Sequence, residues 1–590
     1  MRMEHPSSRI VARLMFRLLP IQILLALIGS VNAVISSLFA GNLIGPEAMA
    51  VAGLYGPAAM FLGAVSTMLT GGSQILCGKY MGKNLISEMQ NTFSLDLAVS
   101  AVLGVLATGF ILLTSVFDLN GFLVRDAAVR PAYNLYAAGQ AAGVLPMVLS
   151  AQLSAFLSLE NQTRRTTVAS VVCIAVNLTL NWLFVAVLRM GVLGLSLASS
   201  LAMWCFFLAE AQYYLTGKAT LRFSFRHIRW RETGEIVRIG LPGAIGYGYQ
   251  TLRGIIVNNL LTAHVGSVGV SAFATANTLL GFFWAIPTGM LAVSRMMFSI
   301  SIGEEDRQTL IDTMRTTLYR YVPLMYAVIA VIIAAAVPLT RMYYRNPADP
   351  VYGMTESGFL ILPLCMPLSI ICMHFTCFGQ VSGKQVLVHI LAALDGVFCV
   401  AGFSALLIPG MGMNSVYVAN VLNGVVTTLT VLLYAVIMKK RLPRSTEDLM
   451  VIPDDFGVAE ADRISLSLHS MEEVIRISHT IQNFCLEKGI DERRAYLAGL
   501  SMEEMAGNVI AHGFSLDSRK HAVDVRVVYK NDGLILRIRD DCRPFDPETR
   551  QKIVDPEDPF RNIGIRMVYD IAGSVSYHSV LGLNVLTITF

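Results

Sequence analysis

Three polar residues near the end of the chain have the types and spacing that nucleotide chemistry needs. Glu504, Asn508 and His512 follow one another at intervals of four residues, and steps of four place side chains on one face of a helix. In such an arrangement a carboxylate can orient a nucleophile, while an amide oxygen one turn later holds Mg²⁺ against phosphates. The spacing therefore predicts a helix that handles Mg²⁺ and phosphate groups.

The elements around this helix predict a separate α/β domain. We expect strands at 463–468, 523–529, 534–539, 574–579 and 585–590 and helices at 471–488, 492–512 and 563–572. Asn531, Asp532 and Gly533 form a strong turn sequence between the second and third strands. The stretch 463–590, which follows a linker at 445–462, is long enough to build a core of its own.

Two further points in this domain have the chemistry to contact a nucleotide. Asp540 ends a strand, where a carboxylate can accept a hydrogen bond from the exocyclic amine of adenine. Gly564 opens a helix whose backbone N–H groups can contact phosphates. Taken one at a time, these features have plain structural readings: a solvated helix face, a strand-end turn and a helix-start glycine. Their order along the chain carries the nucleotide interpretation.

In that order, the domain resembles the GHKL ATP-binding fold, in particular the anti-sigma-factor serine kinase group. The resemblance implies a cytosolic α/β sandwich that takes ATP and Mg²⁺ as cofactors and, beyond binding, acts as an ATP-dependent serine/threonine kinase. The implied roles are general base for Glu504, Mg²⁺ ligand for Asn508, adenine recognition for Asp540, a phosphate-side glycine at Gly564 and a place near the adenine pocket for Thr587.

The domain also departs from the resembled pattern. Cys542 and Pro544 stand where the group often has glycines, and Asn562 replaces another. These departures predict a short or stiff lid, which affects turnover more than binding. His512 lies on the ATP-site helix itself, where a His-Gly pair commonly ends the helix in this group, so we interpret it as a structural helix end and not as a phospho-acceptor.

The rest of the chain has the composition of an integral membrane protein. Hydrophobic residues make up 54% of the sequence and charged residues 15%, with a mean hydropathy of +0.58, far from the averages of soluble domains. Segments of about 20 residues or more can span a bilayer, and they predict an all-α domain of about twelve helices in two halves of six. They cover 18–46, 48–78, 97–117, 131–159, 166–188, 190–209, 236–263, 269–302, 321–340, 357–383, 385–408 and 410–438.

Basic residues cluster on alternate connections between these segments. Lys and Arg gather at the N-terminus, at every second connection and after the last span at 439–444, so the positive-inside rule predicts that both termini are cytoplasmic. This topology accounts for the net charge of +4, and we expect no nucleic-acid partner. The nine cysteines lie in predicted spans or in the cytoplasmic tail and imply no disulfide framework.

Glycines recur at one spacing in the two sets of helices. The separation of Gly45 from Gly266 equals that of Gly191 from Gly412. Two six-helix halves in the same orientation form a parallel repeat, which in transporters places the substrate site between the halves near the bilayer midplane. Single glycine matches are common in membrane helices because small residues allow close packing, so the interpretation depends on the shared spacing.

Three segments of the membrane half, 38–45, 71–82 and 190–198, resemble the MATE (multidrug and toxin extrusion) family. The resemblance covers about residues 10–440, and we assign 1–444 to this domain. It implies two six-helix bundles in a bacterial-type inner cell membrane. It also implies export of a small molecule, usually an organic cation or drug, in exchange for Na⁺ or H⁺.

One departure from this family concerns ion coupling. Members of the bacterial type commonly carry an aspartate in the first helix just before the Phe-Ala-Gly stretch, where this chain has Ser36. Ionisable residues inside the spans that could substitute are Arg253, Arg295, His374, His389 and Asp395. We expect Asp395 to pair with Arg253, with a structural ion pair ranked ahead of a coupling gate.

Two functions of different class fit these observations. In the first, a MATE-like transporter moves an unidentified small molecule across the lipid bilayer by efflux or flipping, and the cytosolic ATP-binding domain regulates it. In the second, the bundle senses a ligand and the kinase domain phosphorylates a cytosolic anti-anti-sigma-like protein. We rank the transporter first, although the serine at position 36 favours the sensor.

Overall fold

The structure, a computed structural model, divides into two compact units. The membrane unit comprises Met15–Glu304 and Met314–Val451, and the sheet unit comprises Ile452–Phe590 together with Met1–Leu14 and Glu305–Thr313. The residues that the structure describes are 6–83, 85–122, 129–216, 219–344, 346–454, 456–458, 460–514, 521, 523–530, 533–543, 547, 563–580 and 583–590.

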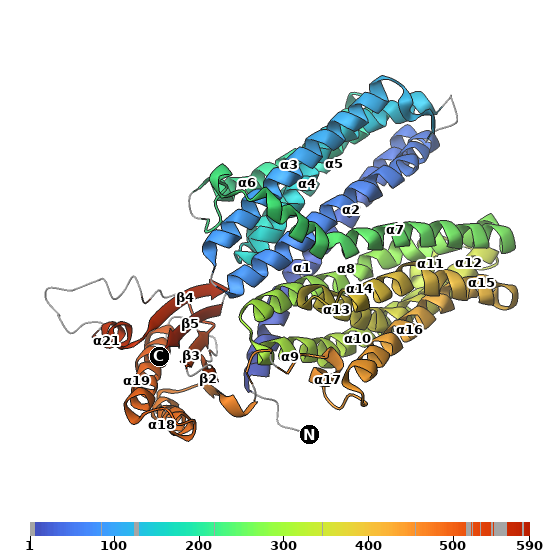
Figure 1. Ribbon diagram of the computed structural model, residues 1–590. Helices are drawn as coiled ribbons and strands as arrows, with labels where there is room; N and C mark the ends of the chain where they lie inside the picture. The colour runs from blue at the N-terminus through green and yellow to red at the C-terminus, as the bar shows by residue number, and fades with distance from the viewer. Residues whose placement is uncertain are drawn as a thin grey trace. The chain divides into compact units, whose positions relative to one another are not determined.

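Long helices make up the membrane unit, as its apolar sequence predicts (Figure 1). Part of α1 and most of α9 belong to the sheet unit. The helices are α1 (Pro6–Phe39), α2 (Pro46–Gly82), α3 (Ile86–Val116), α4 (Arg130–Leu159), α5 (Thr163–Asn181), α6 (Gly191–Leu215), α7 (Thr233–His264), α8 (Ser267–Gly303), α9 (Arg307–Thr316), α10 (Val322–Ala334), α11 (Ala336–Arg341), α12 (Pro350–Ile361), α13 (Met366–Ser382), α14 (Gln385–Ala393), α15 (Cys399–Met411), α16 (Asn414–Lys439) and α17 (Thr446–Met450).

Ten helical segments of the described chain are long and apolar enough to cross a membrane. Several consist of two helices joined by a short π or 3₁₀ turn, as α9 is to α10, α12 to α13 and α14 to α15. The remaining long helices, α1 and α7, have 34 and 32 residues, more than the roughly 20 needed to span a bilayer. Together these elements account for the predicted helices.

The four glycines of the sequence repeat share one backbone property. Gly45 and Gly266 precede α2 and α8 with φ values of 115° and 84°, and Gly191 and Gly412 lie at the starts of α6 and α16 with φ values of 59° and 53°. Positive φ is costly for residues with a Cβ atom, so glycine is needed at all four turns. The shared spacing therefore corresponds to two turns, each of which occurs once in each half.

Close backbone contacts join the two halves along the C-terminal half of α2. A Cβ atom on Gly240 of α7 would lie 1.8 Å from the carbonyl oxygen of Met68, and one on Gly303 of α8 would lie 2.1 Å from that of Lys79. Such distances are far below van der Waals contact, so only glycine allows these helices to touch. Figure 1 shows the ribbons of α2 and α7 diverging away from this contact.

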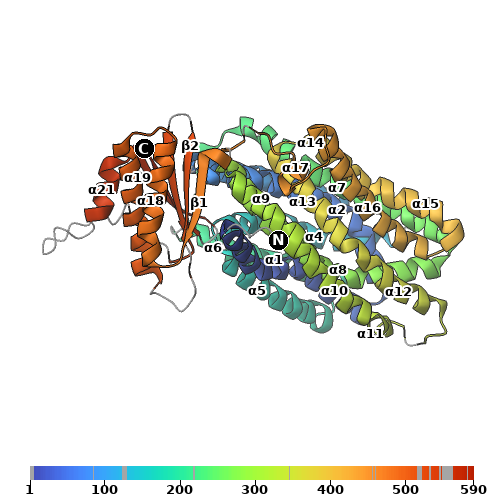
Figure 2. The same cartoon turned by 90° about the horizontal axis from the view of Figure 1, so that it is seen from below.

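The sheet unit contains one antiparallel sheet of five strands in the order β1-β2-β3-β5-β4. Figure 2 shows its helices on one side of the strands. The strands are β1 (Arg463–Leu468), β2 (Val523–Lys530), β3 (Gly533–Asp540), β4 (Ser574–Val580) and β5 (Leu583–Thr589), and the helices are α18 (Met471–Glu487), α19 (Glu492–Asn508) and α21 (Ile563–Ile571).

These bounds match the expected elements to within a few residues, and β1 coincides with the expected strand. The predicted helix 492–512 continues past Asn508 as a π-helical turn, Val509–Gly513. Asn531 and Asp532 of the predicted turn lie outside the described residues, as do Pro544 and Asn562. The sheet unit includes the whole of the expected second domain, 463–590, and contains Glu305–Thr313 and Met1–Leu14 besides it.

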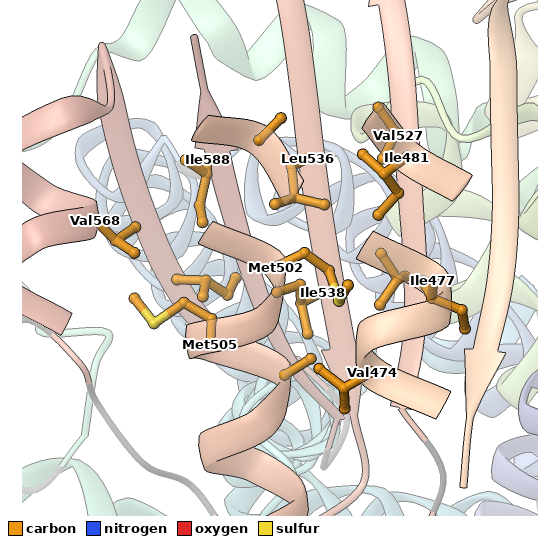
Figure 3. Close-up of a cluster of buried hydrophobic side chains, with 14 of the residues drawn as sticks. Val474, Ile477, Ile481, Met502, Met505, Val527, Leu536, Ile538, Val568 and Ile588 are labelled. Carbon is orange, nitrogen blue, oxygen red and sulfur yellow. The ribbon is translucent and has the colours of Figure 1, made fainter. Parts of the chain in front are cut away.

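The two faces of the sheet differ because strand side chains alternate. Leu536 and Ile538 of β3 point toward the helices and are buried in the core of the unit, whereas Arg537 and Arg539 point to the opposite face. Figure 3 shows this core, in which α18, α19 and α21 pack on β2, β3 and β5. Its labelled side chains are Val474, Ile477, Ile481, Met502, Met505, Val527, Leu536, Ile538, Val568 and Ile588.

Candidate functional site

A cavity of about 270 Å³ lies between the end of α19 and the sheet. Small-molecule pockets begin at roughly 300 Å³ and are mainly apolar with a few convergent polar groups, and this cavity has that character. Its walls are Met505, Asn508, Val509, His512, Gly513, Ile538, Asp540, Cys542, Arg543, Pro547, Tyr577, Asn584 and Leu586. Two of the expected site residues, Asn508 and Asp540, therefore meet at one cavity.

Asp540 supplies a buried carboxylate to this cavity. It is 6% exposed, and its Oδ1 accepts hydrogen bonds from the side-chain amide of Asn584 at 2.7 Å and from the backbone N–H of Cys542 at 2.9 Å. Burial raises the pKa of the Asp540 carboxyl, against the opposing effect of the hydrogen bond from Asn584. A buried carboxylate has about four acceptor positions, so Asp540 can accept a further hydrogen bond from a ligand amine.

Glu504 lies half-buried on α19, one turn before Asn508. A Cβ atom on Gly564, near the start of α21, would lie 1.9 Å from Oε2 of Glu504. The backbone of α21 therefore approaches the carboxylate as closely as glycine permits. This contact brings together two expected site residues that are far apart in sequence.

The end of α19 places Asn508 and His512 at the cavity wall. The last turn of this helix is π-helical, and the extra residue in a π turn shifts the side chains that follow it, often at functional sites. His512 is exposed, in contrast to half-buried Asn508. The regular spacing of four thus describes Glu504 and Asn508, whereas His512 reaches the same cavity from the π turn.

Thr587 lies on the other face of the sheet. Leu586 lines the cavity and Ile588 belongs to the core, so alternation along β5 points Thr587 away from both. Its cross-strand neighbour is Arg537, which is also on that face. The structure therefore does not bring Thr587 to the cavity, and we leave it out of the proposed site.

Asn584 is a polar cavity residue that the sequence interpretation missed. Its amide holds Asp540, and its Oδ1 accepts a hydrogen bond from the hydroxyl of Tyr577 at 3.1 Å. Asn584 stands directly opposite Asp540 in the β3–β5 ladder. Only the strand register shows this pairing, which explains why the sequence did not.

The loop after β3 is anchored by a second polar contact. Nδ1 of His521 lies 2.9 Å from Oδ1 of Asp541, and His521, Asp541 and Cys542 place potential metal-binding atoms within 4.8 Å of one another. This nitrogen- and sulfur-containing set differs from the oxygen ligands that Mg²⁺ prefers. The side-chain oxygens of Asn508 and Glu504 fit Mg²⁺ better.

In the first half of the membrane unit, Ser36 meets another serine. Its Oγ lies 3.4 Å from Oγ of Ser199 on α6. In the second half, Arg253 donates to the backbone oxygen of Asp395 at 3.2 Å, while the Asp395 carboxylate accepts a hydrogen bond from Asn423 at 2.8 Å. Arg253 and Asp395 therefore lie together as expected, but through the backbone and not as the expected ion pair.

Two other carboxylates are buried in the first half. Asp96 of α3 and Glu210 of α6 have no exposed surface. Ser154 donates to Oε1 of Glu210 at 2.7 Å, whereas Oε2 of Glu210 and both oxygens of Asp96 accept no hydrogen bond of normal geometry from the described residues. Sequence reasoning missed them because they directly flank the uncharged stretches 97–117 and 190–209.

Comparison with protein families assigns both the membrane unit and the sheet unit. The MatE family model matches residues 20–183 and 242–402, more than half of the chain. The chain belongs to the MatE family. A second model, described as a histidine kinase-like ATPase domain, matches 469–590, so the sheet unit of this MATE protein contains an ATPase-like domain, and with it the cavity.

Curated relatives and solved structures agree with this assignment. The chain is 25% identical over 242 residues to a probable multidrug resistance protein NorM of Bacillus licheniformis and 26% identical over 244 residues to that of Bacillus subtilis. These matches cover 39% and 38% of this MATE chain and about half, 51%, of the length of each relative. A solved structure of MATE in complex with MaL6 superposes with a TM-score of 0.67 at 20% identity, covering 73% of this chain and 97% of that one.

The family model also supports the internal repeat. Its two matches begin at residues 20 and 242, and α1 and α7 each contain a proline at that position, Pro20 and Pro242. This MATE chain is thus a multi-pass membrane protein with an ATPase-like domain attached.

Proposed function

We propose that the protein exports an amphiphilic small molecule across a bacterial inner membrane and that its cytosolic ATPase-like domain binds Mg-ATP to regulate this export. The observation that carries the proposal is the cavity beside α19, in which Asp540 is buried and held by Asn584. A carboxylate fixed in this way can accept a hydrogen bond from the exocyclic amine of adenine. A site built around such a hydrogen bond rejects analogues that lack the amine.

The other site residues have complementary roles in this proposal. Asn508, at the cavity wall, would hold Mg²⁺, which when bound neutralises phosphate charge. Glu504 would orient a water or hydroxyl nucleophile, and the glycine at 564 lets the start of α21 approach the phosphates next to it. This division of labour separates recognition by Asp540 from turnover by Glu504.

For the membrane unit, we propose that both termini are cytoplasmic and that the halves alternate around a central substrate site. With this topology, the contact of α2 with Gly240 and Gly303 lies at the cytosolic end. The halves are then closed toward the cytosol and diverge toward the outside. Alternating access would require these backbone contacts to open.

We further propose that Asp96 and Glu210 supply the coupling group that position 36 lacks. An ionised carboxylate without a partner is costly in a low-dielectric interior, so each would take up a proton when enclosed and release it when exposed to water. Protonation would then link the state of the first half to the proton gradient.

A sensor kinase is the second candidate. Ser36, which stands where an acid is common, and the meeting of Asn508 and Asp540 at one cavity favour it. In this case the domain would transfer the γ-phosphate to a serine or threonine of a cytosolic protein. Transport in vesicles separates the two functions.

The test uses the full chain in lipid nanodiscs and in proteoliposomes. We expect ATP to bind the wild-type protein, Glu504→Ala to keep binding while losing hydrolysis, and Asp540→Asn to bind ATP more weakly. In proteoliposomes with an imposed pH gradient, ethidium efflux should fall in Asp96→Asn and Glu210→Gln and persist in the control Ser36→Ala. Absence of ATP binding by the wild type refutes the nucleotide site, and efflux that ignores every gradient refutes coupled export.

A further inference from the structure

The face of the sheet without helices carries an unusual concentration of arginine. Because side chains alternate along strands, this face receives Arg463 of β1, Arg526 of β2 and both Arg537 and Arg539 of β3. Asp524 lies on the same face and accepts a hydrogen bond from Ser467. We call the four arginines the arginine face. It needs a counter-charge from elsewhere in the chain.

Asp306, between α8 and α9, supplies that charge. Its carboxylate is fully buried and contacts three guanidinium groups: it pairs with Arg526, with Arg539 at 3.3 Å and with Arg537 at 3.7 Å. Burial alone would raise the pKa of the Asp306 carboxyl, but the three arginines outweigh it and hold this pKa well below its usual range.

The residues around Asp306 extend the contact. Arg463 donates to the side-chain oxygen of Gln308 at 3.1 Å, and Arg539 donates to the hydroxyl of Thr309 at 3.1 Å. Arg307 in turn donates to the backbone oxygens of Pro453 and Phe456 at 2.7 and 2.8 Å. The segment Glu305–Thr313 is therefore built into the sheet unit by side-chain and backbone bonds.

Asp306 also caps the helix that follows it. Its two carboxylate oxygens accept hydrogen bonds from the backbone N–H of Thr309 at 2.9 Å and from the hydroxyl of Thr309 at 2.7 Å, which is the geometry of a helix N-cap. The capped helix α9 continues along the chain into α10, and α8 ends three residues earlier at Gly303, where it touches Lys79 of α2. One carboxylate thus joins the arginine face to the helix pair beside the contact between the halves.

Strand β3 connects the arginine face to the cavity. Arg539 and Asp540 are consecutive, so their side chains leave the strand on opposite faces. Arg539 holds Asp306 and Thr309 on one side, and Asp540 lines the cavity on the other. A ligand that shifts the end of β3 at Asp540 therefore acts on the strand that grips Asp306.

We propose that the arginine face is the docking surface for the α8–α9 connection of this same chain and that Asp306 is the residue that holds the connection there. We further propose that a nucleotide bound at the opposite face of β3 changes how tightly the arginines hold Asp306. The proposal rests on the proposed nucleotide site for its second half. Tightening or loosening the grip changes the freedom of α8 and α9, which must move if the contact at Gly303 is to open. Regulation of transport then acts through the α8–α9 connection.

The test measures hydrogen exchange of the segment 300–316 in the full chain in nanodiscs, with and without Mg²⁺ and a non-hydrolysable ATP analogue. In the wild type we expect the analogue to change the exchange rate by about fivefold or more, the lower end of typical coupling between sites. In Asp306→Asn this change should disappear while the analogue still binds. Asparagine caps helices as well as aspartate does, so the variant removes the charge and keeps the cap.

Matched variants distinguish loss of the Asp306–arginine contact from a general loss of structure. Glu305→Gln alters the neighbouring acid, whose bond to Lys530 is exposed, and it should respond to the analogue like the wild type. Arg537→Gln removes the longest of the three pairs and should reduce the response by an intermediate amount.

Three outcomes overturn the proposal, and they differ in what else they overturn. If the analogue binds but changes exchange equally in the wild type and Asp306→Asn, the proposed coupling through Asp306 is wrong and the nucleotide site stands. If the analogue does not bind the wild type, both ideas fail. If binding is lost in Asp306→Asn and Arg537→Gln alike, Asp306 is a structural clamp and not a coupling residue.

Discussion

A buried aspartate lies at each face of the five-stranded sheet, Asp540 of β3 on the helix side and Asp306 of the α8–α9 connection against the arginine face, and the two have opposite electrostatic surroundings. Asp540 is held by the neutral amide of Asn584 and a backbone N–H, and burial raises the pKa of its carboxyl. Asp306 is surrounded by three guanidinium groups that overcome burial and lower the pKa of its carboxyl. Among the described residues, the Asp540 carboxylate has no cationic partner and can accept a hydrogen bond from a ligand, whereas the Asp306 carboxylate is neutralised by the arginines around it.

The largest expected effect comes from removing the carboxylate that pairs with the arginine face. Asp306→Ala leaves three buried or partly buried arginines without their acid, and removal of one partner of a buried ion cluster costs about 3–5 kcal/mol. We expect faster hydrogen exchange of the β2 and β3 amides in the full chain. Glu305→Ala, the exposed control, should change stability by at most about 1 kcal/mol. Equal effects of the two variants would remove the distinction between the faces.

The next effect concerns turnover on the ligand face. A Cβ atom on residue 564 would lie 1.9 Å from Oε2 of Glu504, so Gly564→Ala must displace the carboxylate or α21. A displacement of about 1 Å in a catalytic group can lower a rate by about 100-fold. ATP hydrolysis by the full chain should fall by this order while ATP binding falls much less. Unchanged hydrolysis would mean that Glu504 is not at the reacting phosphate.

A smaller effect is expected from the adenine side of the same cavity. Asp540→Asn removes a charged hydrogen-bond acceptor, an interaction that contributes about 1.5–3 kcal/mol, so ATP affinity should fall by about 10- to 100-fold. Asp541→Asn is the matched control, because Asp541 contacts His521 and does not line the cavity. Equilibrium binding of labelled ATP measures both, and equal losses would contradict the role of Asp540.

Acidification should separate the two aspartates with the smallest effect. Asp540 has a raised pKa in the folded protein, so on acidification it becomes neutral above the ordinary value of 3.8, and ATP binding should weaken there. The lowered pKa of Asp306 means that its stabilising contribution is complete above its unfolded pKa, near 3.8, and is lost only as pH falls below that value. ATP binding and amide exchange, corrected for the intrinsic effect of pH, are compared from neutral pH downward. Parallel loss of both would contradict this assignment.

Much of the sheet unit was predictable from local patterns. Strand β1 and the start of α19 follow directly from alternating residues and from the helical spacing of Glu504 and Asn508. Thr587 was placed at the cavity, but the period of two in a strand makes an error of one residue a change of face. Leu586 and Asn584 are the residues of β5 at the cavity.

Contacts between distant segments were not predictable in the same way. Asn584 meets Asp540 through strand register, and Asp306 meets Arg526 through an association of segments more than 200 residues apart. No local pattern marks either pair. Asp96 and Glu210 were hidden for another reason, since a search for uncharged spans stops at the charge that limits them.

The sheet unit is discontinuous in sequence. Its segment Glu305–Thr313 is therefore synthesised well before the strands that bind it. With the proposed topology, the strands would bury their arginines against Asp306 only after α8 and α9 have been inserted with their connection on the cytosolic side. An inverted α8–α9 hairpin would leave that carboxylate on the wrong side of the bilayer and the arginines exposed to solvent. With that topology, completion of the sheet unit would depend on correct insertion of α8 and α9, so the arginine face would link the folding of this unit to the orientation of the membrane helices.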